Sequence, residues 1–288
     1  MAQPRSRFDP SLKPADLPVD LLASLWKRTA TAHEHLFNTW CAAVSDRLGE
    51  GAASQITQDA WPGRHGKAMD EVFLEDLRVI VEVVRSMPKM LTLGEFDEEL
   101  IPEWLRRSGA DGAAPSLEGL SQAALAQLWN FAALAYMLVT ERWYGAVKAR
   151  YGDERAQELE KEVWLDRGGA EYDLKIGLDA LGVTGTDVEA LLSGFQFAPG
   201  EVGILEVEFE LPAPDHGILT HRACPALNRF EHSDPGRLKH SCEICIAGMP
   251  LSGEMLSKDI TCRPLKLPPR LHPGDIACRW EYRITRSE

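Results

Sequence analysis

The sequence predicts an α+β protein in which a duplicated, all-helical bundle is followed by a small cysteine-rich α+β domain. Three observations carry this prediction. Apolar residues recur at three- and four-residue steps over the first two thirds of the chain, this region matches itself, and from Pro199 onwards the apolar period changes to two. The expected boundaries are 16–108 and 116–198 for the two helical repeats and 199–288 for the cysteine-rich domain.

The internal repeat is clearest in the aromatic residues. At an offset of 103 residues, three tryptophans fall on three others, as Trp26, Trp40 and Trp61 on Trp129, Trp143 and Trp164. Residues 22–76 aligned with 125–179 give 17 identities in 55 positions without a gap. Such a match indicates a duplication. We expect the paired tryptophans to lie in the core, since large aromatics at matched positions of a bundle are usually buried.

Each copy is predicted to be helical. In the second copy the expected helices cover about 125–143, 154–164, 171–181 and 187–192, and glycines separate them. The first copy adds an apolar helix over 77–84, and the segment 109–115, rich in Gly, Ala and Pro, links the copies. Two such units should pack face to face as one bundle with pseudo-twofold symmetry.

Two histidines distinguish the first copy from the second. His33 and His35 align with Tyr136 and Leu138. Polar groups at bundle-facing positions could line a pocket between the copies. The alternative is that the two histidines, only two residues apart, point to different sides and lie at the surface.

The last third of the chain has the pattern of a sheet. Residues 205–211 and 278–284 alternate between apolar and charged side chains, with acidic charges in the first segment and basic ones in the second. The two strands could therefore be neighbours in one antiparallel sheet. A third strand is expected over 261–267 and a short helix over 238–249.

Five of the six cysteines fall within this last third, as Cys224, Cys242, Cys245, Cys262 and Cys278. A Cys-x-x-Cys pair with further thiols and histidines nearby has three interpretations. The first is a zinc site built from Cys224, Cys242, Cys245 and either Cys278 or a histidine. The second is an iron–sulfur cluster on four of the five cysteines. The third is a group of unligated thiols, one of them nucleophilic. Cys262 and Cys278 could both be buried, whereas Cys224 is expected in a loop before Pro225.

Composition limits the classes of partner that the protein can bind and indicates its cellular compartment. The net charge of −13 argues against nucleic acid and anionic membranes, because phosphate binding needs a basic face. The longest apolar run, about 131–139, is too short for a membrane helix. No secretion signal is evident at the start, so we expect a cytoplasmic protein with reduced cysteines. A small-molecule substrate or ligand is the expected partner, and the protein could be a monomer or a homodimer.

The second repeat and the tail, about 125–285, resemble a bacterial family described as L-2-amino-thiazoline-4-carboxylic acid hydrolase-like. The matching pieces are Leu128-Trp129, Trp143, Gly152, Glu162-Val163-Trp164, Cys224, Cys242, Pro268-Pro269 and Cys278-Arg279-Trp280. The tail is more distantly similar to the 4-vinyl-reductase domain, a small-molecule-binding module. The additional N-terminal copy departs from the shorter family pattern.

This resemblance implies hydrolysis of a non-peptide C–N or C–S bond in a small molecule. A Cys-ligated zinc could activate water, or a thiolate could attack directly. In the metal version His221 or His240 would be a proton shuttle or the fourth ligand, and Glu243 is the nearest carboxylate, although a solvated helix residue is its simpler interpretation. The alternative function is a small-molecule-binding or sensor protein in which the metal site is only structural.

Overall fold

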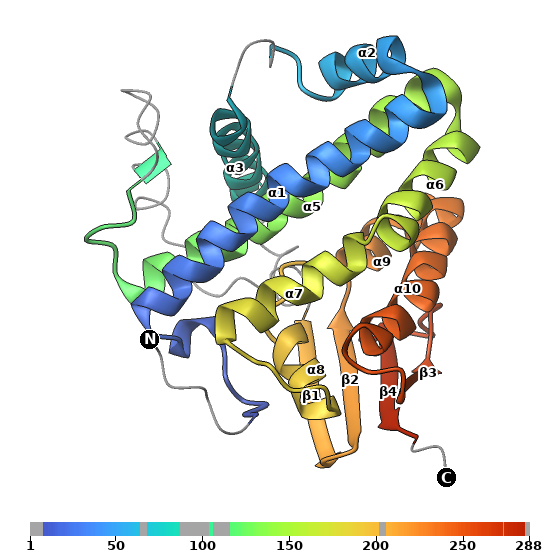
Figure 1. Cartoon of the computed structure of the whole chain (residues 1–288). Helices are drawn as coiled ribbons and strands as arrows, with labels where there is room; N and C mark the ends of the chain where they lie inside the picture. Colours follow the sequence, from blue (N-terminus) through green and yellow to red (C-terminus); the bar gives the residue numbers. More distant parts are fainter. Residues whose placement is uncertain are drawn as a thin grey trace.

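The structure, a computed structural model, places a layer of helices beside a four-stranded antiparallel sheet, which confirms the α+β class (Figure 1). It describes residues 8–63, 68–86, 104–105, 116–201, 206–272 and 274–285. The link expected over 109–115 lies outside these residues, as does the first residue of the strand expected over 205–211.

Two long helices form the centre of the helical layer. They are α1 (Val19–Leu48) and α5 (Gln122–Tyr151), each of 30 residues. The indole of Trp40 donates to Thr140 Oγ1 at 3.3 Å, and that of Trp129 donates to Thr29 Oγ1 at 3.2 Å. Both pairs are 100 residues apart in sequence, so the helices lie side by side and run in the same direction (Figure 1).

All six matched tryptophans are buried, which confirms their expected place in the core. Trp40 and Trp143, which correspond in the repeat, stack with ring centroids 6.2 Å apart. The two long helices also end alike. Gly49 and Gly152 follow them with φ of 91° and 89°, values that favour glycine because a Cβ would be strained there.

Shorter helices complete this layer and lead towards the sheet. They are α2 (Glu50–Ala60), α3 (Met69–Ser86), α6 (Asp153–Lys161), a π-helical turn (Glu162–Asp166) and α7 (Gly169–Leu181). Helix α7 contacts α1 on one side and α10 (Pro235–Leu256) on the other. It therefore lies between the two long helices and the C-terminal part of the chain (Figure 1).

Helix α5 is long and apolar enough to cross a membrane by length and composition, although its longest uninterrupted apolar run, about 131–139, is short. Of its most apolar window, 67% is buried inside the protein. A central helix of a bundle has the same character, because it is surrounded by apolar neighbours.

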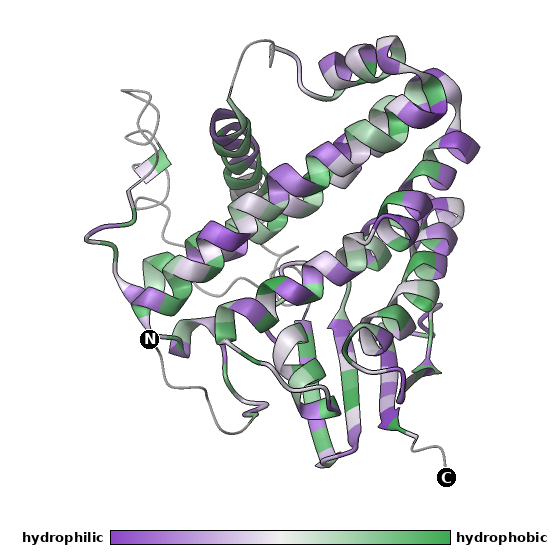
Figure 2. Cartoon of the chain, viewed as in Figure 1, coloured by the Kyte–Doolittle hydropathy of each residue, from purple (hydrophilic) through white to green (hydrophobic). Residues whose placement is uncertain are grey.

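The sheet contains four strands in the order β1-β2-β4-β3, all antiparallel to their neighbours. The strands are β1 (Glu206–Ala213), β2 (His216–Ala223), β3 (Ile260–Lys266) and β4 (Cys278–Ile284). Hydrophilic and hydrophobic residues alternate along β1 (Figure 2). The expected strands 205–211, 261–267 and 278–284 correspond to β1, β3 and β4.

Strand β2 was not predicted, and it corrects two expectations. The strands expected over 205–211 and 278–284 are not neighbours, because β2 lies between them. Their opposite charges still meet, since Arg279 Nη2 lies 2.7 Å from Glu210 Oε1. The segment before Cys224 is also the end of β2 and not a loop. Strand β2 has three consecutive buried residues, Leu219, Thr220 and His221, so its sequence lacks the simple alternation of a half-exposed strand.

Helices pack against one face of the sheet. They are α8 (Val188–Phe195) and α10, while the short α9 (Pro225–Phe230) connects β2 to α10. A hydrophobic cluster joins them to the strands, and its largest members are Phe195, Phe209, Trp280 and Tyr282. The helix expected over 238–249 is the middle of α10, which is longer at both ends. It begins earlier because Asp234 caps its start by accepting a hydrogen bond from Arg237 N, and at the other end it continues past Pro250.

Helix α10 is joined to the bundle by a buried ionic cluster. Glu160 of α6 accepts a hydrogen bond from Arg237 Nη2 at 2.8 Å, and its other oxygen lies 3.0 Å from His240 Nε2. The guanidinium of Arg237 also stacks 3.9 Å above the ring of Tyr144. All three side chains are at most 7% exposed. The cluster therefore fixes the rotation of α10 and the direction in which its cysteines point.

Replacement of Glu160 by alanine should strongly destabilise the fold. It would leave the buried Arg237 with only Glu141, whose carboxylate lies 3.0 Å away and is 35% exposed, and breaking a buried ion pair from one side costs about 3–5 kcal/mol. The control is Glu158→Ala on the same helix, where the side chain is 55% exposed and pairs with Arg155; its loss should stay below about 1 kcal/mol. Urea unfolding followed by tryptophan fluorescence measures both, and equal small losses would contradict the role of the cluster.

Candidate active site

Strands β2 and β4 bring a histidine and a cysteine together. His221 and Cys278 lie directly opposite each other in the antiparallel pairing of these strands. Opposite residues project from the same face of a sheet with Cβ atoms about 5 Å apart. The ring Nδ1 of His221 lies 2.9 Å from Cys278 Sγ. The imidazole is therefore in hydrogen-bond contact with the cysteine sulfur.

Glu201 extends this pair to three groups. Its Oε2 lies 2.5 Å from Nε2 of His221, the ring nitrogen that does not face Cys278. The side chain of His221 is 5% exposed and that of Glu201 13%, so both are shielded from bulk water. The indole N–H of Trp280 also donates to Cys278 Sγ, at 3.3 Å. A thiol, an imidazole and an orienting carboxylate in this order are the arrangement used for nucleophilic catalysis.

The charge on His221 follows from its two partners. Burial by itself would lower the pKa of His221, but the charge of Glu201 and the hydrogen bonds with Cys278 and Glu201 raise it well above 6.5. At neutral pH the ring is therefore an imidazolium placed between a carboxylate and a sulfur. An adjacent imidazolium favours the thiolate form of a cysteine, which is the nucleophilic form.

Asp173 of α7 supports Glu201 from behind. Its Oδ1 accepts the backbone N–H of Gly200 at 2.9 Å. A Cβ on Gly200 would lie 2.7 Å from the other oxygen of Asp173, so the close approach requires glycine. Burial raises the pKa of Asp173 to about 7. The contact fixes the backbone immediately before Glu201 and so helps to hold the carboxylate on His221.

Three further thiols, those of Cys224, Cys242 and Cys245, lie within electrostatic reach of Cys278. Burial raises the pKa of Cys224 above 9.0 and that of Cys242 to about 11. It also raises the pKa of Cys245 well above 9.0, although this residue is exposed at the surface. All six cysteines of the chain are free. The three additional thiols are therefore neutral at physiological pH.

The predicted metal site is wrong. Among the residues that the structure describes, no group of three or more His, Cys, Asp or Glu side chains is arranged to hold a metal ion. The physical reason is that the strongest donors are already engaged. Both ring nitrogens of His221 face Cys278 and Glu201.

The other two candidate catalytic residues lie apart from Cys278. At about 100° per residue, His240 projects from α10 on roughly the opposite side from Cys242 and Cys245, and it binds Glu160 in the bundle. Glu243 is 57% exposed and lies 3.7 Å from Lys239, one turn earlier. Of the three residues predicted as catalytic, only His221 is brought together with the cysteines.

The histidines of the first repeat point to different sides. His33 is fully buried, and its Nε2 lies 2.8 Å from Asp76 Oδ2. Trp61 Nε1 donates to the same carboxylate at 3.1 Å, and Arg142 Nη2 lies 3.0 Å from it. His35 lies at the surface and stacks on Tyr172. His33 thus belongs to a polar cluster of the bundle interior, remote in sequence from the five cysteines of the last third of the chain.

Glu201 and Asp173 were missed in the sequence. Glu201 follows Pro199-Gly200 in a segment without periodicity, and Asp173 lies within a helical pattern where an acidic residue is expected to face water. The one sequence signal for this contact was the position of Gly200. A glycine next to a carboxylate, at the point where helical periodicity gives way to a strand, is typical of a close backbone approach.

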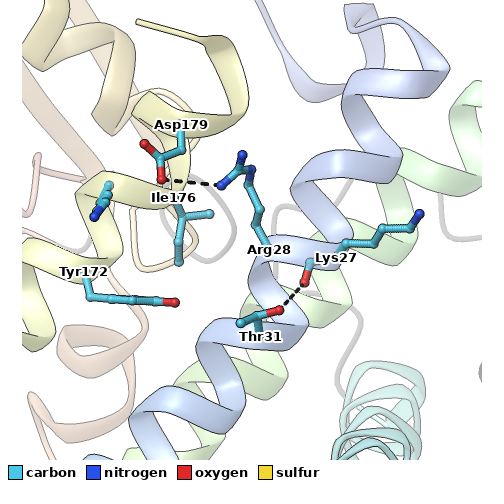
Figure 3. Close-up of a pocket in the computed structure, with 7 residues that line it drawn as sticks. Lys27, Arg28, Thr31, Tyr172, Ile176 and Asp179 are labelled. Carbon is cyan, nitrogen blue, oxygen red and sulfur yellow. Dashed lines mark hydrogen bonds and ion pairs between the residues drawn. The ribbon is translucent and has the colours of Figure 1, made fainter. Parts of the chain in front are cut away.

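A separate cavity of about 290 Å³ lies between α1 and α7 (Figure 3). It is lined by Lys27, Arg28, Thr31, Tyr172, Lys175, Ile176 and Asp179. Arg28 pairs with Asp179 at 3.4 Å, whereas neither lysine forms an ion pair with a described residue. The cavity carries excess positive charge in an acidic protein, but it contains no cysteine or histidine.

No protein-family model, curated protein or solved structure matches this chain. The family resemblance and the activity that it implies therefore stay predictions.

Replacement of Asp173 by asparagine should change how stability depends on pH. The folded pKa of about 7 lies above the ordinary value of 3.8, so the folded state keeps a proton that the unfolded chain has released, and the free energy of unfolding falls as pH rises through this window. In the wild type this titration should lower the free energy of unfolding by about 2–3 kcal/mol between about pH 5 and pH 8. Asparagine is always neutral, so the variant should lack this decrease.

Urea unfolding at both pH values measures this effect. The control is Asp179→Asn on the same helix, where the side chain is 44% exposed and pairs with Arg28. This variant should change stability by less than about 1 kcal/mol at either pH. An Asp173→Asn protein with the same pH dependence as the wild type would contradict the assignment.

His221 should control the reactivity of Cys278. At neutral pH, iodoacetamide should alkylate Cys278 about tenfold or more slower in His221→Gln, because the cation that favours the thiolate is lost. Peptide mass spectrometry measures the rate at each cysteine. His216→Gln is the matched control, since His216 lies on the same strand and binds Glu281 instead. Equal rates in both variants would exclude an imidazolium–thiolate pair.

Proposed function

We propose that this protein is a thiol-dependent hydrolase that cleaves a non-peptide C–N or C–S bond in a small molecule. The observation that supports it most strongly is the contact series Cys278–His221–Glu201, with distances of 2.9 and 2.5 Å around one buried imidazole. The catalytic roles are Cys278 as nucleophile, His221 as general acid and base, and Glu201 as the orienting carboxylate.

The proposed reaction has two halves. The thiolate of Cys278 attacks the carbon of a carbonyl or imine-like group, and the electron pair of the double bond moves to its oxygen or nitrogen. When that pair returns, the C–N or C–S bond breaks and His221 gives its proton to the leaving atom. Neutral His221 then takes a proton from water, the hydroxide attacks the thioester-like carbon, and Cys278 leaves as a thiolate.

The fixed direction of the imidazole supports these roles. Glu201 holds Nε2, so Nδ1 stays turned towards Cys278 and the leaving group. Asp173 holds the backbone that carries Glu201. Such pre-organisation favours catalysis because the groups need not reorient as charge moves from sulfur to substrate. The reaction also needs reduced thiols, which supports a cytoplasmic location.

The substrate class follows from the resemblance described above. A family of thiazoline-carboxylate hydrolases implies a small cyclic substrate in which an sp² carbon is bonded to nitrogen and sulfur. A thiolate is chemically suited to attack such a carbon. The direct thiol route is the one proposed, because the described residues offer no metal site.

The second candidate function is binding of a small acidic ligand in the cavity between α1 and α7. Lys27 of α1 and Lys175 of α7 are among its lining residues and form no ion pair with a described residue. Tyr172 adds an aromatic ring (Figure 3). Titration calorimetry with small aromatic carboxylates, on the wild type and on Lys175→Ala, tests this function. Binding that the substitution abolishes would support it.

The helical layer is proposed to be a duplicated scaffold for either function. Its two 30-residue helices end at Gly49 and Gly152 with nearly equal φ angles, 103 residues apart. The segments 16–108 and 116–198 would then be the two copies, and 199–288 the cysteine-rich domain. Whether the protein is a monomer or a homodimer stays a prediction for solution measurement.

Cys278→Ser should abolish the proposed activity. We expect kcat/KM for 2-amino-thiazoline-4-carboxylate or a related cyclic substrate to fall by about 10³-fold or more, and Glu201→Gln to lower it less. Cys262→Ser is the control, because Cys262 is a half-buried thiol on β3. A screen of cyclic amides, thiazolines and thioesters provides the substrate. Full activity in Cys278→Ser would refute the proposal, as would the absence of turnover across the whole panel.

A further inference from the structure

Two N–H groups converge on the sulfur of Cys278. The ring Nδ1 of His221 lies 2.9 Å from Sγ, and the indole N–H of Trp280 donates to the same atom at 3.3 Å. The roles assigned above to Cys278, His221 and Glu201 leave Trp280 without one. An indole N–H is a donor only. It can therefore stabilise negative charge on the sulfur without exchanging a proton with it.

The place of Trp280 in the sheet fixes the direction of this N–H. Trp280 and Cys278 are two residues apart on β4, so their side chains project from the same face. Trp280 lies opposite Leu219 of β2 on one side and Pro264 of β3 on the other, and neither side chain has an acceptor. Trp280 is 1% exposed within the hydrophobic cluster between sheet and helices. The ring is therefore held with its N–H towards Cys278.

A donor fixed on a sulfur favours the charged form of that sulfur. Hydrogen bonds to an ionised acceptor are about twice as strong as those to a neutral one. When Cys278 is acylated its sulfur loses its charge, and the buried N–H keeps only a weak acceptor, which is unfavourable. The strong hydrogen bond is regained as the C–S bond breaks and negative charge returns to the sulfur. The N–H therefore stabilises the transition state in which Cys278 leaves.

We propose that Trp280 is a further catalytic residue, which activates Cys278 as the leaving group in the second half of the reaction. This inference rests on the proposed function. In that step neutral His221 takes a proton from water, and the hydroxide attacks the thioester-like carbon. The C–S bond breaks and its electron pair stays on Sγ, while the proton stays on His221. The hydroxide oxygen remains in the product, and Trp280 gives up no proton.

A simple ester isolates the release of Cys278. p-Nitrophenyl acetate transfers its acetyl group to a thiolate, and the p-nitrophenolate that is set free is measured by absorbance. After the unreacted ester is removed, loss of the acetyl group from the tryptic peptide 271–279, which contains Cys278, measures hydrolysis of the thioester. We expect this hydrolysis to be about tenfold or more slower in Trp280→Phe, because the N–H is lost and an aromatic ring is kept.

The rate of acetylation separates this role from a structural one. Loss of the N–H makes the thiolate scarcer but more nucleophilic, so acetylation should change much less than hydrolysis. A second variant carries benzothienylalanine at position 280, which replaces the N–H by sulfur in a ring of nearly the same shape, and it should behave like Trp280→Phe. Trp164→Phe, at a tryptophan of the helical bundle, is the matched control and should behave like the wild type.

Equal hydrolysis rates in the wild type and both variants at position 280 would overturn the inference. Parallel slowing of acetylation and hydrolysis would overturn it as well, as would a Cys278 that the ester does not acetylate. The acetyl ester is not a substrate of the proposed hydrolase, so the two proposals can fail separately. Slower release in the variants without turnover of any cyclic substrate would support Trp280 alone, whereas normal turnover with equal release would refute Trp280 alone.

Discussion

The buried imidazolium of His221 is the interaction on which the candidate site depends. A charged ring with 5% exposure is tolerated only because a carboxylate lies 2.5 Å from one nitrogen and a sulfur lies 2.9 Å from the other. Each partner stabilises the charge on the ring and raises the pKa of His221. The site is therefore a single electrostatic unit, and removal of any of its three members changes the other two.

The rest of the fold can be understood as the framework that keeps this unit in place. Strand pairing sets Cys278 opposite His221, and the hydrogen bond from Gly200 to Asp173 sets the approach of Glu201. A second buried ionic cluster, formed by Arg237, Glu160 and His240, fixes α10 against the bundle. Both clusters place a histidine against a buried carboxylate. In α10 the other partner of the carboxylate is an arginine, and the cluster holds the helix against the bundle. In the sheet the other partner of the histidine is Cys278, the nucleophile of the proposed reaction.

Much of the fold could be predicted from the sequence, since periodicity reports burial directly. The helices at 125–143 and 171–181, the strand at 278–284 and the buried tryptophans all follow from that signal. Strand β2 could not be predicted, because Gly217, Ile218 and Leu219 follow one another and its sequence lacks the alternation of apolar and charged residues that marks β1 and β4. Without β2, the contact between His221 and Cys278 was invisible, although both residues were candidates. Glu201 gave no signal, because its role depends on a close approach to Asp173 that only the folded chain creates.

Charge also explains why the same cysteines suggest a metal in the sequence and thiol chemistry in the structure. Four thiolates require a strong positive charge among them, which a metal ion would supply. In the fold, the cation in contact with a cysteine sulfur is the ring of His221, and Glu201 already shares it. Burial raises the pKa of Cys224 above 9.0 and that of Cys242 to about 11, so these two thiols stay protonated. The contact with one imidazolium singles out Cys278 as the candidate nucleophile of the proposed reaction.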